Sequence, residues 1–510
     1  MNSVQSPTKQ PSTHTNKAEL RRLAAGTLMP GFTGIAVPVW ILEAYDAGLA
    51  AVCLYGTNVA SSVQLRELCA GLRAHSPNTL IAVDEEGGDV TRLHYLTGSN
   101  QPGNAVLGRL DDVELTAASA AAIGHELAGL GINLNLAPDA DVNSAPDNPV
   151  IGARSFGAEP DLVARHTAAW IRGLEDAGVA SCAKHFPGHG DTTTDSHLTL
   201  PVVRADAATL EARELVPFRA LVAAKGATVM TSHILVQALD PEHPATFSAR
   251  ILQELLRHDM GFEGVIITDA LDMAGASAQT GVPEAAVRAL VAGADLLCLG
   301  SETGPVLYER TLTAILDAVD EGRLPLERLA DAAARTAALS TRFRAASAEE
   351  IQQAAIRGQF GPQPGRAPAN AALAPLDDER IAEAFEVSEA AKKWLERQEP
   401  VAIVQVETGT NVAVGHVPWG PAAATDSVVH EGEVPDGARV AVVGRGLDAE
   451  HPLWTVFARL RAEGHAVIAV ECGWPRGGAD IVTFGASLAV SQALVALLAG
   501  KARIDVQPIN

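Results

Sequence analysis

Short apolar runs alternate with amphipathic stretches from about residue 30 to residue 340. Apolar runs of this length, bounded by turn residues, are typical of buried strands, and the stretches between them have helical periodicity. We expect strands at Gly34–Pro38, Ala51–Tyr55, Leu80–Asp84, Ile132–Ala137, Val179–His185, Thr228–His233, Val265–Asp269 and Asp295–Leu299. We expect helices at Ser62–Ala74, Val113–Leu130, Asp161–Ala177, Ala207–Ala224 and Glu284–Ala292. Eight strand–helix units in this span predict a (β/α)8 barrel.

Polar residues cluster where the predicted strands end. These residues are Asp84, Asp139, Lys184, His185, His233 and Asp269. A barrel of parallel strands brings all its carboxyl ends to one face, where barrel active sites lie. Their convergence is stronger evidence for a site than any one of them alone.

The pattern divides the chain into four parts. Residues 1–18 are polar and predict a disordered leader without the apolar core of a signal peptide. Residues 19–345 hold the barrel, and residues 346–398 form a helical and Pro-, Gly- and Ala-rich linker. In residues 399–510 the alternation resumes, which predicts a smaller C-terminal α/β domain. Its expected strands are Val401–Val406, Val440–Val443, Ala466–Val470 and Ile481–Phe484, with a helix at Ser491–Leu498.

Composition narrows the class of protein. The formal net charge of −23 argues against nucleic acid as a partner, because phosphate repels an acidic surface. No apolar run is long enough to span a membrane. The five cysteines are scattered and contain no CxxC pair, which favours free thiols in a reducing cytoplasm.

The densest group of ionisable residues lies between Lys184 and His197, where Pro187, Gly188 and Gly190 exclude a regular helix. Five side chains there are possible metal ligands: His185, His189, Asp191, Asp195 and His197. The i,i+4 spacing of the first two aligns ligands only on a helix, so we prefer a polar substrate site over a metal centre or a purely structural turn.

Three further segments carry candidate chemistry. The glycines between Asp84 and Arg92 let backbone approach a ligand, although the segment could be only a polar turn, and Arg154 could be a solvated surface residue. Asp269 ends an apolar run, as a nucleophile, general base or helix N-cap would. Residues 444–449 fit G-x-G-x-x-A, a dinucleotide fingerprint, but the domain lacks a second mononucleotide half.

Taken together, these segments resemble glycoside hydrolase family 3, and within it the NagZ-like β-N-acetylglucosaminidase branch. The resemblance covers roughly residues 25–345. The motifs that carry it are Val83-Asp84-Glu85-Glu86-Gly87-Gly88, Arg154-Ser155-Phe156-Gly157, Lys184-His185-Phe186-Pro187-Gly188-His189-Gly190, Asp195-Ser196-His197 and the strand end at Asp269. The family usually has Gln and Arg where this chain has Glu85 and Asp89, and a second Asp where it has Ala270.

The resemblance implies an exo-acting enzyme that cleaves terminal β-linked N-acetylglucosamine with retention, through a covalent glycosyl-enzyme. Asp269 would be the nucleophile and His197 the general acid/base, with Asp195 as its partner. The residues that would bind the sugar are Asp84, Arg92, Arg154, Lys184 and His185. A histidine in the acid/base role repels an anionic acceptor less than a carboxylate, so a phosphorylase with the same residues is an alternative.

The same residues are compatible with other functions. A β-glucosidase or β-xylosidase, and a non-catalytic sugar-binding protein, are the rivals, and the substrate-assisted route would use Asp84 and Glu85. Chito-oligosaccharides and muropeptides are the candidate substrates, consistent with chitin degradation or peptidoglycan recycling in the cytoplasm. No metal or organic cofactor and no membrane partner are expected, and the oligomeric state is open.

Overall fold

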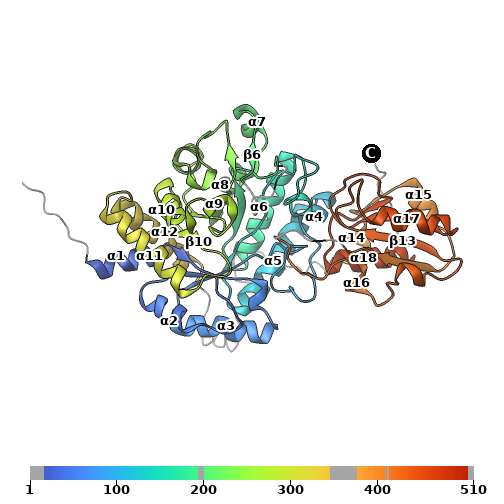
Figure 1. The fold of residues 1–510 in the computed structure, drawn as a ribbon, viewed down its shortest axis with the longest axis horizontal. Helices are drawn as coiled ribbons and strands as arrows, with labels where there is room; N and C mark the ends of the chain where they lie inside the picture. The colour runs from blue at the N-terminus through green and yellow to red at the C-terminus, as the bar shows by residue number, and fades with distance from the viewer. Residues whose placement is uncertain are drawn as a thin grey trace, which may run out of the picture.

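The structure is a computed structural model that describes residues 16–192, 194, 200–344, 376–407, 409 and 413–502. Its larger domain, blue to yellow in Figure 1, contains eight short strands. They are β1 Leu28–Met29, β2 Ala51–Leu54, β3 Leu80–Val83, β4 Leu134–Asn135, β5 Cys182–Phe186, β7 Thr228–Thr231, β9 Val265–Ile267 and β10 Leu297–Cys298. Two further strands, β6 (Val202–Val203) and β8 (Leu235–Val236), pair with each other outside this set.

The eight strands follow one another around a closed ring. Parallel pairing joins β2 to β3 and β4, β5 to β7 and β9, and β10 to β1. Parallel bridges link Leu134 to Ala180 and Ile267 to Leu296, and the Cys53 amide donates to the Pro30 carbonyl. The predicted (β/α)8 barrel is therefore the architecture of this domain.

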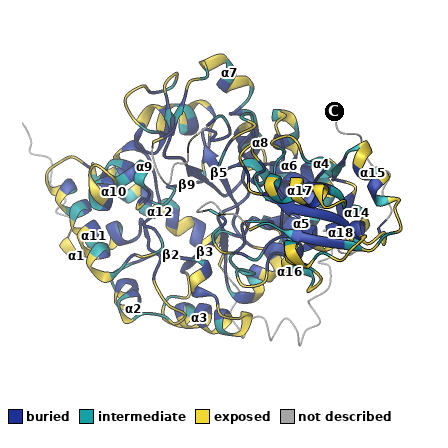
Figure 2. Ribbon diagram, turned by 45° about the vertical axis from the view of Figure 1, so that its right-hand side comes forward, coloured by how far each residue is buried: buried dark blue, intermediate teal, exposed yellow. Residues whose placement is uncertain are grey.

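Helices surround the barrel. They are α1 Lys17–Ala25, α2 Val39–Asp46, α3 Ser62–His75, α4 Asn104–Leu110, α5 Val113–Leu130, α6 Pro160–Asp176, α7 Ala207–Ala212, α8 Val216–Ala223, α9 Ala274–Ser277, α10 Gly281–Ala292, α11 Pro305–Asp320 and α12 Leu326–Arg342. A π-helical segment covers Arg250–Asp259, and short 3₁₀ turns cover Gly56–Asn58, Gly152–Arg154 and Ala245–Phe247. Figure 2 shows buried strands and exposed outer helix faces.

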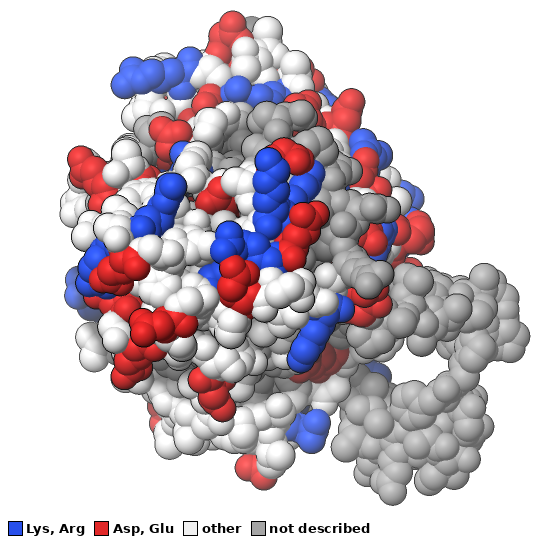
Figure 3. All heavy atoms as spheres, turned by 90° about the vertical axis from the view of Figure 1, so that its right-hand side faces the viewer, with Lys and Arg blue, Asp and Glu red and all other residues white. Residues whose placement is uncertain are grey.

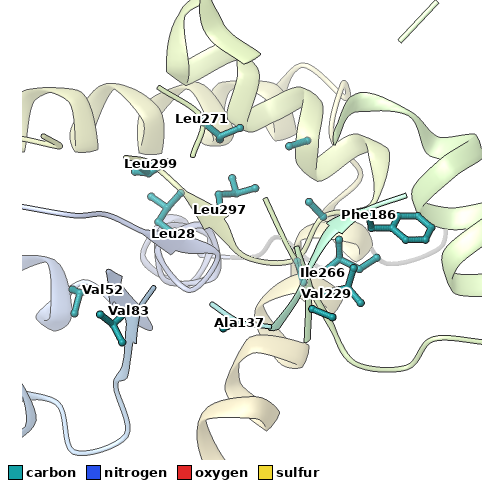
Figure 4. Packing of buried hydrophobic residues seen from close by; sticks show 14 of the residues in the cluster. Leu28, Val52, Val83, Ala137, Phe186, Val229, Ile266, Leu271, Leu297 and Leu299 are labelled. Atoms are coloured by element: carbon teal, nitrogen blue, oxygen red, sulfur yellow. The ribbon is translucent and has the colours of Figure 1, made fainter. Parts of the chain in front are cut away.

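Alternation along each strand builds two layers of core. Leu28, Val52 and Ile266 belong to a cluster that includes apolar residues of the surrounding helices (Figure 4). Their neighbours Cys53 and Ile267 belong to a second cluster inside the ring. This arrangement follows from successive strand residues pointing to opposite faces.

The C-terminal domain is a five-stranded sheet of order β11-β15-β14-β13-β12. Its strands are β11 Glu386–Val387, which is antiparallel to β15, and the parallel β12 Val401–Gln405, β13 Arg439–Gly444, β14 Ala466–Glu471 and β15 Ile481–Val482. Its helices are α14 Asp378–Ala382, α15 Glu389–Leu395, α16 Pro421–Ala424, α17 Leu453–Ala462 and α18 Leu488–Leu498, with a 3₁₀ turn at Glu431–Glu433.

The two domains share part of a core. Ala105 and Val106 of α4 are fully buried in the cluster that α14, α15 and α18 form against the C-terminal sheet. Figure 1 shows α4 beside this domain. On the face of the C-terminal domain shown in Figure 3, basic and acidic side chains are interspersed among the described residues. The contact through α4 means that the domains are packed together rather than only joined by a linker.

Two elements predicted for the barrel differ in the structure. Gly34–Pro38 is not a strand: the first strand is Leu28–Met29, which is fully buried, whereas Gly34 has φ +102° and Pro38 caps α2. The helix predicted at 207–224 is two helices, because Pro217 stands in the first turn of α8.

The C-terminal domain begins before the predicted boundary at residue 399, since β11 and its flanking helices pack on its sheet. The predicted leader through residue 15 and the linker at 345–375 lie outside the described residues. Among the helices that the structure describes, none combines the length and apolar character needed to cross a membrane.

Candidate active site

A pocket of about 610 Å³ opens at the carboxyl ends of the barrel strands. Six of the eight residues predicted for the site line it: Asp84, Arg92, Arg154, Lys184, His185 and Asp269. The other two, Asp195 and His197, lie outside the described residues. Strand-end position accounts for Asp84, Lys184, His185 and Asp269, whereas Arg92 and Arg154 come from the loops after β3 and β4 and are expected only from the family resemblance.

Lys184 lies near the end of β5 and is 2% exposed. Its Nζ donates to Asp84 Oδ1 at 2.7 Å and lies 2.8 Å from Glu86 Oε1. Burial alone would lower the pKa of this ammonium, but the two carboxylates raise it above its usual value. The lysine therefore stays charged, and it orients Asp84 at the pocket wall.

Glu86 connects this lysine to Arg154. The Arg154 guanidinium donates through Nη2 to Glu86 Oε1 at 2.8 Å and through Nε to Glu86 Oε2 at 3.0 Å. Burial opposes ionisation of Glu86, but Arg154 and Lys184 hold the pKa of its carboxyl well below its usual range. Glu86 was part of the quoted motif but had no predicted role, because sequence does not reveal that one carboxylate serves two cations.

Asp141 supports His185, which lies in β5, and His189, which follows this strand. His185 Nδ1 lies 2.8 Å from Asp141 Oδ2, and the His189 backbone amide donates to Asp141 Oδ1 at 2.6 Å. Although burial opposes it, these contacts lower the pKa of Asp141, whereas burial and the neighbouring Asp141 raise the pKa of Asp139 well above its usual value. Because His185 Nδ1 is engaged by the Asp141 carboxylate, Nε2 is the ring atom that remains for a ligand.

Asp139, Asp141 and His185 also have ligand atoms within 4.8 Å of one another, which a metal ion would need. However, Asp141 is already engaged with His185 and with a backbone amide, and the Arg154 guanidinium lies 3.5 Å from Asp139 Oδ2. A neighbouring guanidinium repels a cation, and the possible ligand atoms are already engaged. We therefore interpret the cluster as a hydrogen-bonded support for His185 rather than a cation site.

Asp269 follows β9 at the pocket wall and is half-buried. Its Oδ1 accepts the backbone N–H of Ala270 at 2.7 Å. The next helix, α9, begins only at Ala274 and is capped by Met273, so Asp269 is not a helix N-cap. His233, which follows β7, bridges the Thr246 hydroxyl and the Ala270 carbonyl and so fixes the backbone beside Asp269.

Close packing holds the described part of the loop after β5. A Cβ on Gly190 would lie 1.6 Å from the Val142 carbonyl oxygen, so only glycine fits there. The Asn148 side chain donates to the carbonyls of His189 and Gly190 at 3.0 and 3.1 Å. Asp191, considered above as a metal ligand, instead pairs with Arg213 at 2.6 Å.

The C-terminal domain contributes to the pocket. Arg92 donates through Nη2 to the Ala413 carbonyl at 2.7 Å, and Ala413 itself lines the pocket. Asp89 accepts the backbone N–H of Ala486 at 2.7 Å. Arg92 therefore anchors the second domain at the pocket wall, a contact between residues 321 positions apart that no local pattern signals.

Comparisons of this chain with known proteins agree on one family. The model of the glycosyl hydrolase family 3 N-terminal domain matches residues 42–339. The chain is 36% identical over 334 residues to β-hexosaminidase A of Pseudoalteromonas piscicida, a match that covers 60% of this chain but only 55% of that protein. It is also 36% identical over 330 residues to a β-hexosaminidase of Neisseria meningitidis, covering 62% of this chain and 89% of the relative.

Solved structures extend the likeness to both domains. A family 3 β-N-acetylglucosaminidase from a Paenibacillus species superposes with a TM-score of 0.81 at 29% identity, covering 95% of this chain and 97% of that one. NagZ from Neisseria gonorrhoeae, solved in complex with N-trifluoroacetyl-D-glucosamine, gives a TM-score of 0.55 at 32% identity, covering 64% of this chain and 92% of that one.

Proposed function

Because the chain belongs to glycosyl hydrolase family 3, we propose that it is an exo-acting, retaining β-N-acetylglucosaminidase. One observation carries the proposal: a single pocket holds Asp269 at a strand end together with a buried charge network around Lys184 and Glu86. The relatives named β-hexosaminidase and the structure holding an N-acylglucosamine analogue support the choice of sugar.

The pocket suits a hydroxylated ring. Asp84 Oδ1 accepts from Lys184, which leaves Oδ2 to accept sugar hydroxyl protons. His185 presents Nε2, and Arg92 adds a guanidinium at the wall. A volume of about 610 Å³ is within the range for small-molecule sites and accommodates a terminal sugar with part of its aglycone.

In the proposed mechanism, a carboxylate oxygen of Asp269 attacks the anomeric carbon while the bond to the leaving oxygen breaks. His197 donates its proton to that oxygen, which gives a glycosyl ester of Asp269 and the free aglycone alcohol. His197 then takes a proton from water as the water oxygen displaces Asp269, releasing the sugar with retained configuration. Asp195 would hold the imidazole tautomer.

The proposed substrates are chito-oligosaccharides or muropeptides that end in β-linked N-acetylglucosamine. We place the enzyme in the cytoplasm, in chitin degradation or peptidoglycan recycling. The five cysteines are buried and unpaired in the structure, in keeping with a reducing compartment.

The test is hydrolysis of p-nitrophenyl β-N-acetylglucosaminide beside the matching β-glucoside, with the first-formed sugar observed by NMR. We expect the N-acetyl substrate to react much faster and the β anomer of N-acetylglucosamine to appear first. An α anomer appearing first would contradict retention, and faster turnover of the glucoside would contradict the choice of sugar. A sugar 1-phosphate formed in phosphate buffer would identify a phosphorylase instead.

A further inference from the structure

The dinucleotide fingerprint of the C-terminal domain does not form a phosphate cradle. In the loop after β13, the backbone amides of Gly446 and Leu447 donate to the two oxygens of Glu471 at 2.9 and 2.6 Å. These are loop amides that a pyrophosphate would need. Because the protein's own carboxylate occupies them, the motif serves to shape the loop rather than to bind a dinucleotide.

The same loop directs Arg445 toward the barrel, where a second pocket of about 310 Å³ lies between the domains. On the C-terminal side the pocket is lined by Arg445, His451, Trp474 and Arg476, and on the barrel side by Asp89 and residues 148–154. We call it the interdomain pocket. It shares Val150 and Arg154 with the pocket that holds Asp269, so the two are adjacent.

His451 gives the interdomain pocket an unused donor. The ring is 7% exposed, and its Nδ1 accepts the backbone N–H of Leu453 at 3.1 Å, so the proton of the neutral ring is on Nε2. This buried Nε2–H has no hydrogen-bond partner among the described residues. A buried donor without an acceptor is costly, and an acceptor atom of a ligand would satisfy it.

The remaining lining groups favour an anion. Arg445 and Arg476 offer guanidinium forks that match the oxygens of a carboxylate or phosphate. The Arg445 guanidinium lies 4.6 Å from the centre of the Trp419 ring, which holds it in place. Asp89 is the acidic side chain of the lining, and its Oδ1 accepts the backbone N–H of Ala486. The two guanidinium groups and the His451 donor outnumber this single carboxyl group.

We propose that the interdomain pocket binds an oxyanion, a carboxylate or a phosphate group, through Arg445, Arg476 and His451 Nε2. The oxyanion is either part of the aglycone of a substrate seated in the adjacent pocket or a free anion from solution. The first source rests on the proposed glucosaminidase function, whereas the second does not.

The experiment uses the full-length protein and the variants Arg445→Met and Arg476→Met. Arg445→Met removes the contact with Trp419 and could impair folding. Arg476 is exposed, so Arg476→Met tests the pocket without disturbing the packing. Arg461→Met is the matched control, because Arg461 is also exposed and lies over an aromatic ring, that of Phe457, but is not part of the interdomain pocket. Binding of inorganic phosphate is measured by calorimetry.

Two disaccharides then separate the sources: N-acetylglucosamine linked β-1,4 to N-acetylmuramic acid, which carries a carboxylate, and chitobiose, which does not. If the aglycone supplies the oxyanion, each pocket variant lowers kcat/KM for the acidic disaccharide about tenfold and leaves chitobiose unchanged within about twofold. If the anion is free, the wild type binds phosphate, the variants bind it about tenfold more weakly, and the two disaccharides are affected alike.

The proposal is overturned if the wild type binds no phosphate and the variants leave the preference between the disaccharides unchanged. Equal effects of Arg461→Met and the pocket variants would also overturn it, because the loss would then reflect net charge alone. A wild type that cleaves neither disaccharide contradicts the proposed function, and in that case phosphate binding alone decides whether the interdomain pocket takes an anion.

Discussion

The barrel and the C-terminal domain both place polar residues at or near the carboxyl ends of parallel strands, yet the two sets do different things. In the barrel, Lys184 and Glu86 pair around a pocket that also exposes Asp84 and Asp269. In the C-terminal domain, Glu471 turns back onto the amides of its own neighbouring loop. Strand-end position therefore predicts where polar groups gather, but unused hydrogen-bonding capacity facing a cavity decides whether they form a site.

The two carboxyl groups, Glu86 and Glu471, also differ in the charge of their neighbours. Glu86 has two cationic partners, which keep it ionised despite burial. Among the described residues, the side chain of Glu471 accepts hydrogen bonds only from backbone amides, and burial raises its pKa to about 7 although Arg476 and Arg445 lie near enough to oppose the shift. The barrel network is thus ionic at neutral pH, whereas the C-terminal loop holds a carboxyl group that is close to its titration point.

The largest expected effect is on catalysis at the barrel face. Asp269→Ala removes the proposed nucleophile and is expected to lower kcat on p-nitrophenyl β-N-acetylglucosaminide by roughly 10⁴-fold without altering the far-UV circular dichroism. Added azide should restore part of the turnover by attacking from the vacated side. The control is Asp259→Ala, an exposed aspartate in the π-helical segment, which should retain activity. Near-wild-type activity of Asp269→Ala would rule out this role.

The second largest expected effect is on stability, when the ionic network of Glu86, Lys184 and Arg154 in the barrel is broken. Glu86→Gln leaves Lys184 and Arg154 buried without their shared anion, and we expect it to cost about 3–5 kcal/mol in the free energy of unfolding at pH 7, measured by urea denaturation. The control Glu309→Gln removes an exposed pair with Arg21 and should cost less than about 1 kcal/mol.

The pH dependence of this network has a definite sign. Because the folded-state pKa of Glu86 is depressed, its contribution is present above the usual pKa range of glutamate and is lost as the pH falls through the lower folded-state value. A difference between wild type and Glu86→Gln that grows as the pH falls from 7 to about 3 would contradict this.

Glu471 should show the opposite behaviour. Between its unfolded pKa of about 4.3 and the folded value of about 7, the folded state binds more protons, so the wild type loses stability as the pH rises through this window. Relative to Glu471→Gln, which cannot titrate, we expect a loss of about 3 kcal/mol between pH 4.5 and pH 8, measured by urea denaturation at each pH. A constant difference across this range would show that Glu471 is ionised throughout.

The same substitution, glycine to alanine, can be compared in the two regions. Gly190→Ala places a methyl group against the Val142 carbonyl in the barrel loop and should cost about 1–3 kcal/mol with a clear fall in kcat. Gly446→Ala, in the C-terminal loop, meets no atom within 4 Å and is penalised only by its φ of +72°, so about 1 kcal/mol and unchanged kcat are expected. Equal losses of kcat in the two variants would remove the distinction between the loops.

The sequence analysis predicted the family, the fold class and the glycoside hydrolase class, and all three are confirmed. Asp84, Lys184, His185 and Asp269 could be placed in one pocket from sequence because barrel topology brings strand ends together, and the family resemblance added Arg92 and Arg154. The supporting contacts could not be found in this way. Asp141 acts on His185, 44 positions away, and Ala413 reaches the pocket from the second domain, so both depend on tertiary packing rather than on a local pattern.

Local cues also misplaced some elements. The two-residue strand Leu28–Met29 is too short to produce a recognisable alternation. The apolar run after Gly34 matches the pattern of a strand better, although Gly34 has a positive φ. The residues of β11 lie in a stretch that resembles a linker, and only pairing with β15 makes them part of a sheet. The roles assigned to Asp269, His197 and Asp195 remain predictions.

The most direct test of the central claim is to trap the glycosyl-enzyme. The protein is incubated with a 5-fluoro-N-acetylglucosaminyl fluoride, whose second fluorine slows hydrolysis of the ester, and is then digested and analysed by mass spectrometry. We predict that the peptide containing Asp269 gains the mass of one fluorinated N-acetylglucosaminyl group and that Asp269→Ala gains none. An adduct on another residue, or none while the reagent is turned over, would contradict the claim.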